Sequence, residues 1–322
     1  MSPDLIVSGT PRQAIGVREA RALDFFHHAV APAISGHVRS EFWTRDVLRM
    51  CLQEPAVRHA MLAVSSLYEA FDDVRDRNAF AIQQYNSSIR HMRDVADEAV
   101  VLVVCVLMIC VECLQGNPQM VIQHCLHGQA ILKGTTSRWA QDNLFPIFCR
   151  LDILPFLVGG TAAPFSTLGG FEGLTISPDN HTKLEQLQNS LFLLLPPTTR
   201  HVQICNLLRA DPGRPGLAAA LAERRRLTGL FDDWYAAYTE FQRGPTLRGE
   251  DGPALQGLEI RWILGVIWVD MALEPVDASY DKHLPKFQRI VELATMAIAT
   301  TAGRGPRPAF LFEMGFMPLL NL

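Results

Sequence analysis

The chain has 322 residues, of which 48% are hydrophobic and 19% are charged, so it can bury a large core and is not expected to be disordered as a whole. Its net charge of −4 offers no basic surface to a nucleic-acid backbone, so we expect no direct contact with nucleic acid. Composition and charge therefore favour a globular protein and argue against a strongly basic nucleic-acid binder.

The first residues, MSPDLIVSGTPRQ, lack the basic stretch and apolar segment of a signal peptide, so we expect a protein that is not secreted and lies in the nucleus or the cytoplasm. The longest apolar run covers residues 99–111 and is closed by Glu112. It is shorter than the ~20 residues that span a bilayer, which predicts a buried core helix and no membrane partner. The seven cysteines are expected to be reduced, buried thiols.

Helical periodicity dominates the N-terminal half after a flexible terminus at residues 1–17. A helix that is apolar on nearly all sides, over 98–114, is expected to be central, and Gly116-Asn117-Pro118 predicts the end of one helix and the start of the next. The predicted helices of this half span residues 18–34, 44–53, 54–71, 75–96, 98–114 and 120–132.

The middle of the chain is richer in glycine and proline, and residues 159–173 predict a loop over the surface or over a pocket mouth. Helical patterns return over 217–241, 254–273 and 280–301, and Arg224-Arg225-Arg226 is expected on a solvated helix face. Short turns between helices predict an all-α fold of stacked antiparallel helix hairpins that form one helical domain over residues 18–322.

The segment FFHHAVAPAISGHVRSEFWTRDVLRMCLQEPAVRHAMLAVSSLYEA, residues 25–70, resembles the start of the fungal-specific transcription factor domain, the middle homology region of zinc-cluster regulators. AIQQYNSSIRHM, CVECLQGN and HCLHGQAILKG fit the same family, and later segments such as LFPIFCRLDI and FLFEMGFMPLL fit it more loosely. The resemblance extends over about residues 20–320; it is strong over 25–135 and weak over 160–250.

The resemblance implies a transcription-factor-like regulatory or ligand-sensing module, linked to fungal secondary metabolism. Members of the family usually carry an N-terminal cluster of six cysteines, but here the first cysteine is Cys51, inside a predicted helix, so we expect no DNA-binding domain in this chain. The chain also ends at Leu322, where the family generally continues. The expected partners are an apolar small-molecule ligand between the helices and a complete zinc-cluster regulator.

The pattern most similar to a metal site consists of Cys110 and Cys113, followed by His124 and His127. The two histidines are more closely spaced than zinc ligands usually are, so core thiols and helix-face histidines are expected, with no metal and no cofactor.

A second hypothesis is a cofactor-independent enzyme, a cyclase, dehydratase or isomerase that acts on an apolar metabolite in a helical cavity. Its candidate proton-handling residues are Glu112, His127, His28 and Asp152. Glu112 interrupts an apolar run, so it either reaches solvent or an arginine at the helix end, or lies in an apolar pocket. Asp152 and Asp270 are more simply explained as structural ion pairs. A fragment without independent activity is a third hypothesis, and one pocket that unites the four candidates would favour the enzyme.

Overall fold

The computed structural model describes residues 16–35, 41–69, 77–154, 168–177, 181–211, 213–244, 251–274 and 280–301. Within these ranges the chain forms helices, turns and bends and no strand, so the predicted all-α class is confirmed. The helices of the N-terminal half are α1 (Val17–Phe25), α2 (Ala31–Ser35), α3 (Val47–Gln53), α4 (Pro55–Glu69), α5 (Arg77–Met92), α6 (Glu98–Gln115), α7 (Pro118–Gly134) and α8 (Arg138–Leu151). Those of the C-terminal half are α10 (Leu184–Phe192), α11 (Leu195–Ala210), α12 (Leu217–Arg243), α13 (Gly252–Met271) and α14 (Leu284–Thr301).

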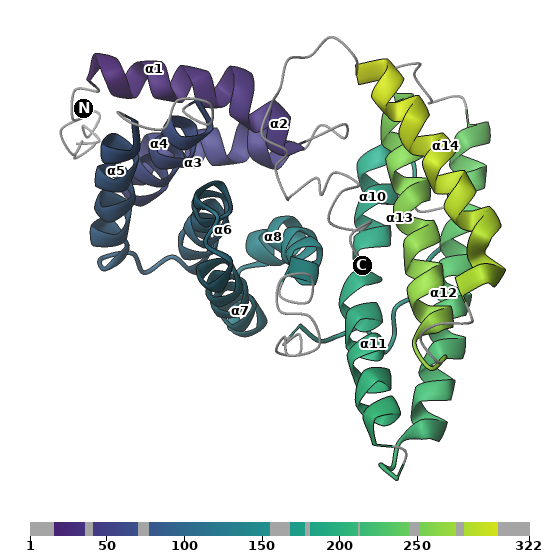
Figure 1. Cartoon of the computed structure of the whole chain (residues 1–322). Coiled ribbons are helices and arrows are strands. Elements are labelled where there is room, and N and C mark those ends of the chain that lie inside the picture. Colours follow the sequence, from purple (N-terminus) through teal and green to yellow (C-terminus); the bar gives the residue numbers. More distant parts are fainter. Residues whose placement is uncertain are drawn as a thin grey trace, which may run out of the picture.

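Consecutive helices pack against each other in both halves (Figure 1). Helix α4 lies against α5, α6 against α7, and α13 against both α12 and α14. Helices α10 and α11 follow each other end to end along α12 and α13, and α14 packs on α13, so these helices form an elongated bundle beside the N-terminal half (Figure 1). Helix α8 contacts both α10 and α11. This is the predicted arrangement of stacked helix hairpins.

Helix α6 lies at the centre of the N-terminal half. The Asp97 side chain caps its first turn by accepting from Ala99 N at 2.8 Å, and Gly116 ends it in the left-handed region at φ 68°. Asn117 and Pro118 then start α7, as the sequence predicts. Helix α6 is long and apolar enough to cross a membrane, but 72% of it is buried inside the structure, as expected of a core helix.

One hydrophobic cluster joins the two halves. It contains Trp43, Met61 and Leu107 from the N-terminal half together with Ile263 and Leu293 from α13 and α14. A second cluster surrounds Trp234 and lies between α10, α12 and α13.

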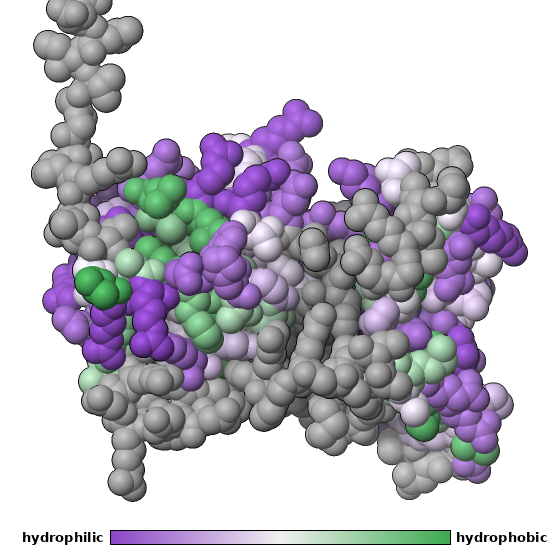
Figure 2. Space-filling view, turned by 90° about the horizontal axis from the view of Figure 1, so that it is seen from above, coloured by the Kyte–Doolittle hydropathy of each residue, from purple (hydrophilic) through white to green (hydrophobic). Residues whose placement is uncertain are grey.

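The surface also carries hydrophobic side chains. Seen from above, they gather over the N-terminal helices and are bordered by hydrophilic side chains (Figure 2).

The structure differs from the prediction mainly around prolines. Helix α8 contains Pro146, and α11 begins at Leu195 with Pro196 in its first turn, where a missing N–H costs no helical hydrogen bond. Helices α8, α10 and α11 are not among the predicted helices. The first predicted helix is also divided, since Phe26–Val30 forms a π-helical turn between α1 and α2.

Two predicted segments fall largely outside the described residues. The N-terminus was expected to be flexible to residue 17; residues 1–15 are not described, and Val17 already belongs to α1. Of the predicted loop at 159–173, the structure describes only 168–173, where Leu168 and Phe171 are buried against the core.

Alanine substitutions at two helical glycines would test how tightly the helices pack. A Cβ on Gly265 of α13 would lie 2.5 Å from the Phe231 ring, whereas a Cβ on Gly229 of α12 would meet nothing within 4 Å. We expect Gly265→Ala to lower the free energy of unfolding by about 1–2 kcal/mol, because a buried ring must move. Gly229→Ala should raise it by about 0.5–1 kcal/mol through helix propensity. Urea unfolding of both variants measures the difference, and equal effects would contradict this packing.

Candidate functional site

A surface pocket of about 400 Å³ lies where the end of α3 faces the first turns of α6 and α8. Its lining consists of Asp46, Arg49, Met50, Gln53, Glu54, Asp97, Ala99, Val100, Ser137 and Trp139. Asp97 and Ser137 are the N-caps of α6 and α8, so the local capping that starts each helix also fixes two walls of the pocket.

The pocket combines an apolar wall with several charges. Met50, Val100 and Trp139 provide the apolar surface, and the Trp139 indole packs on Phe42 with ring centroids 6.5 Å apart. The charged groups are three carboxylates and the Arg49 guanidinium. A volume and lining of this kind suit a small molecule with both apolar and polar parts.

Glu112 lies near the end of α6 and is only 3% exposed. The expectation that its side chain reaches solvent is therefore wrong. Its Oε1 accepts a hydrogen bond from the Tyr85 hydroxyl at 2.8 Å, and its Oε2 accepts from Asn117 Nδ2 at 2.9 Å. His124 Nε2 lies 4.0 Å from Oε1. Burial lowers the pKa of His124, although the Glu112 charge opposes that shift. The carboxylate therefore has polar partners from α5, the α6–α7 turn and α7.

Asp152 directly follows α8 and is 5% exposed. Gln129 Nε2 donates to its Oδ1 at 2.8 Å, and the Thr199 hydroxyl lies 3.4 Å from its Oδ2. These contacts connect α7 and α8 of the N-terminal half to α11 of the C-terminal half.

The two candidate histidines are exposed. His28 pairs with Asp24 one turn earlier in the helix, and His127 lies on the outer side of α7. None of the four candidates, Glu112, His127, His28 and Asp152, lines the α3–α6–α8 pocket. The structure therefore does not bring them together in the way that the enzyme hypothesis requires.

All seven cysteines are free; five are buried and two are half-buried. Burial raises the pKa of Cys51 and Cys205 to about 11 and that of Cys105 and Cys113 to about 12. Such thiols stay protonated and unreactive at neutral pH. Among the described residues, no group of three or more His, Cys, Asp or Glu side chains could hold a metal ion.

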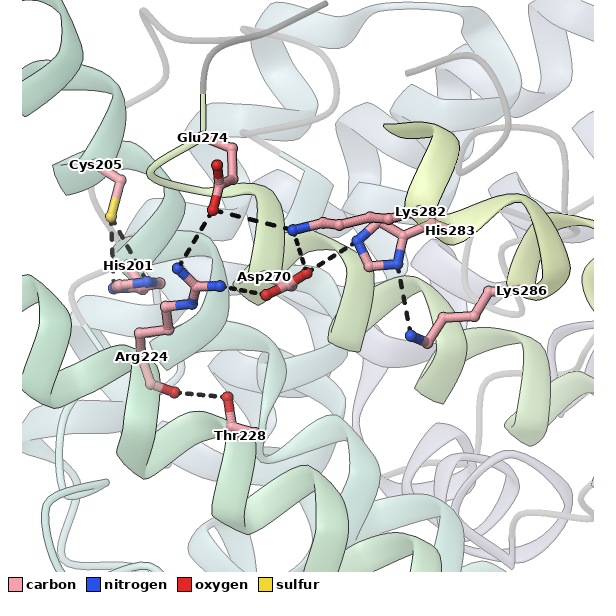
Figure 3. Close-up of polar contacts among 9 residues, drawn as sticks. All are labelled: His201, Cys205, Arg224, Thr228, Asp270, Glu274, Lys282, His283 and Lys286. Atoms are coloured by element: carbon pink, nitrogen blue, oxygen red, sulfur yellow. Dashed lines mark hydrogen bonds and ion pairs between the residues drawn. The ribbon is translucent and has the colours of Figure 1, made fainter. Parts of the chain in front are cut away.

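A cluster of ionic contacts surrounds Asp270 at the end of α13 (Figure 3). Its carboxylate pairs with Arg224 of α12 on one side, and with Lys282 Nζ at 2.7 Å and His283 Nε2 at 3.0 Å on the other. Lys286 Nζ lies 3.5 Å from the other ring nitrogen of His283. This confirms the ion pair expected for Asp270.

Arg224 corrects the prediction of a solvated arginine face. It is half-buried against Asp270, while Arg226 is bound by Glu223, and Arg225 alone of the three is exposed. The sequence signalled Asp270 as a charge within the apolar stretch IWVDMA, but nothing in its spacing pointed to Lys282 and His283 as partners.

The buried Glu112 can be tested through its tyrosine. Tyr85→Phe removes one hydrogen bond from a buried carboxylate and should lower the free energy of unfolding by about 1–3 kcal/mol. In a Glu112→Gln background the same change should cost less, because the acceptor is then neutral. Tyr235→Phe is the control, since Tyr235 is exposed and its hydroxyl makes no described hydrogen bond. Urea unfolding of the parent, the two single variants and the double variant gives the coupling. An equal cost in both backgrounds would contradict it.

Acid is expected to destabilise the fold through histidines that are buried or half-buried. Burial holds the pKa values of His59, His124, His201 and His283 below the ordinary 6.5. The unfolded chain therefore binds protons first, so the contribution of these groups is complete above about pH 6.5 and is lost as the pH falls from there through the lower pKa values of the folded state. Urea titrations between about pH 7.5 and 5.5 should show the loss, and His283→Gln should reduce the slope. An unchanged slope in that variant would exclude His283 as one of the groups responsible.

Comparison with known proteins finds similarity to one family. No curated protein and no solved structure matches the chain. Residues 21–162 match the family model described as the fungal specific transcription factor domain, just under half of the chain, and this confirms the resemblance predicted from the sequence over that range. The matched range runs from α1 through α8 and includes every residue that lines the pocket. From Arg21 to Ala162 the chain is thus similar to the fungal specific transcription factor domain, a similarity that indicates a regulatory role.

Proposed function

We propose that the chain is a regulatory module of transcription that responds to a small-molecule effector bound in the α3–α6–α8 pocket. The observation that carries this proposal is the position of the pocket, because all of its lining residues fall within the segment that resembles the regulatory domain. The pocket also lies at the N-terminal end of the central helix α6, next to the core of that segment.

Binding there would act on three helices at once. An effector that touches α3, α6 and α8 stabilises the conformation in which these three elements face each other, by an amount set by its affinity and concentration. Helix α3 leads through Glu54 into α4, which packs against α5 and α6. A change at the pocket would therefore reach the surface of the N-terminal half through these helices.

The effector we propose differs from the purely apolar ligand expected from the sequence. The pocket offers charged groups beside Met50, Val100 and Trp139, so an amphiphilic molecule satisfies its lining better than a hydrocarbon does. The net charge of −4 supports action through a protein that itself carries a DNA-binding domain, and a zinc-cluster regulator is the partner we propose.

The regulatory role can be tested with a reporter gene. Fused to a heterologous DNA-binding domain, the full chain should change transcription from a reporter that carries the matching site, and the response should depend on a small molecule. Gln53→Trp, an exposed position on the pocket lining, should fill the pocket and abolish the ligand response. Gln83→Trp on the exposed side of α5 is the matched control and should keep it.

The same variants give a direct binding test. A ligand that raises the melting temperature of the parent protein and of Q83W, but not of Q53W, supports the pocket as its site. A fusion that leaves the reporter unchanged, together with a chemically diverse ligand panel that shifts none of the three proteins, would refute the proposal.

A further inference from the structure

We propose that the effector is an organic cation, a small molecule in which one amine or guanidinium group is attached to an aromatic or other flat apolar body. This inference rests on the proposed function, since it specifies the ligand of the same pocket. Four features of the pocket support it: its net charge, the state of its helix ends, its aromatic wall and its size.

The charged lining residues are three carboxylates, Asp46, Glu54 and Asp97, and one guanidinium, Arg49, so the lining has a net charge of −2. Arg45 lies outside the lining and binds Asp46 with Nε 2.9 Å from Oδ1. Asp46 is therefore already compensated, and the remaining lining charges, Glu54, Asp97 and Arg49, sum to −1. Glu54 and Asp97 have no ion-pair partner among the described residues, so their charge is available to a ligand.

The two helix N-termini in the pocket could be thought to attract an anion instead, because unpaired backbone N–H groups and the helix dipole favour negative charge. Both ends are already capped from within the chain. Asp97 accepts from Ala99 N at 2.8 Å, and Ser137 accepts from Ala140 N at 3.3 Å. Asp97 also places a full negative charge at the first turn of α6, which more than offsets the partial positive charge of the helix end. An anionic ligand would meet capped donors and two carboxylates without an ion-pair partner, and the Arg49 guanidinium is the one lining group that would attract it.

The aromatic wall fits the remaining part of such a ligand. Trp139 is half-buried and lines the pocket, and Phe42 supports its indole ring from the core. Indole is the side chain that binds cations most strongly over its face, and it also stacks on flat apolar groups. Met50 and Val100 extend the apolar surface, and Met50 adapts to ligand shape.

The size of the pocket limits the ligand. About 400 Å³ lies in the lower part of the range of about 300–1,000 Å³ that is typical of small-molecule sites. This volume accommodates a molecule with one or two rings and a short charged arm, and it is too small for a folded peptide segment.

Three probes that share one ring system but differ in charge test the inference: 1-naphthylmethylamine as the cation, 1-naphthalenemethanol as the neutral analogue and 1-naphthaleneacetate as the anion. Isothermal titration calorimetry on the full chain at neutral pH should give at least about tenfold tighter binding of the amine than of the alcohol, and weaker binding still of the anion. The preference should decrease as salt is added, because the carboxylates are partly exposed.

The double variant Glu54→Gln with Asp97→Asn removes the two free charges and keeps a capping side chain on α6. It should reduce amine binding to the level of the alcohol and leave alcohol binding unchanged. The matched control, Glu240→Gln with Asp232→Asn, makes the same change of charge at exposed positions on α12 and should retain the full preference. Trp139→Leu should weaken the amine and the alcohol alike.

The two proposals fail in different ways. If the alcohol or the anion binds as tightly as the amine in a manner that Gln53→Trp abolishes, the pocket binds ligands but the cation is wrong. If amine binding is unaffected by E54Q/D97N, the charge assignment is wrong. If no probe binds the parent chain, the cation is wrong, and the reporter fusion with the diverse ligand panel then decides whether the pocket binds an effector at all.

Discussion

The burial of α6 is the constraint on which the rest of the N-terminal half depends. Its residues are apolar on nearly every side, from Ala99 to Val111, so no single neighbour can cover it. Helices α4, α5, α7 and α8 each pack against it, and its two ends are fixed by the Asp97 cap and by the left-handed Gly116. The α3–α6–α8 pocket lies at one end of this helix and the buried Glu112 near the other. Both sites are therefore held by the same rigid element.

Buried carboxylates connect neighbouring helices in both halves of the structure. Glu112 binds partners from α5 and the α6–α7 turn, and Asp152 joins α7 and α8 to α11. In the C-terminal half, Glu259 of α13 takes two hydrogen bonds from Arg289 of α14 and a third from Tyr238 of α12. Apolar surface alone would let helices slide past one another, whereas directional bonds of this kind fix which residues face each other. The carboxylates that resembled catalytic groups in the sequence thus have a structural use.

Most of the helices could be predicted from the sequence because the residues that end and cap them are neighbours in the chain. Gly116, Asn117 and Pro118 specify the α6–α7 turn through backbone conformation and capping, and no distant residue is needed. Helices α8 and α11 were not predicted because each contains proline, which signals both a helix start and a helix break, and only tertiary packing decides between them. Helix α10, a short helix of nine residues, was not predicted either. The pocket could not be predicted either: Glu54, Asp97 and Trp139 are far apart in the chain, and only the packing of α3, α6 and α8 brings them together.

The seven thiols have a practical consequence. Each has a pKa held above the ordinary value by burial, so none reacts readily while the helices are closed. They lie on α3, α6, α7, α8 and α11. Alkylation of the five buried thiols would then require local opening of the helices that carry them. One buried cysteine lies on each of these five helices, so the order in which Cys51, Cys110, Cys125, Cys149 and Cys205 are modified would rank how readily the helices open locally, without any introduced label.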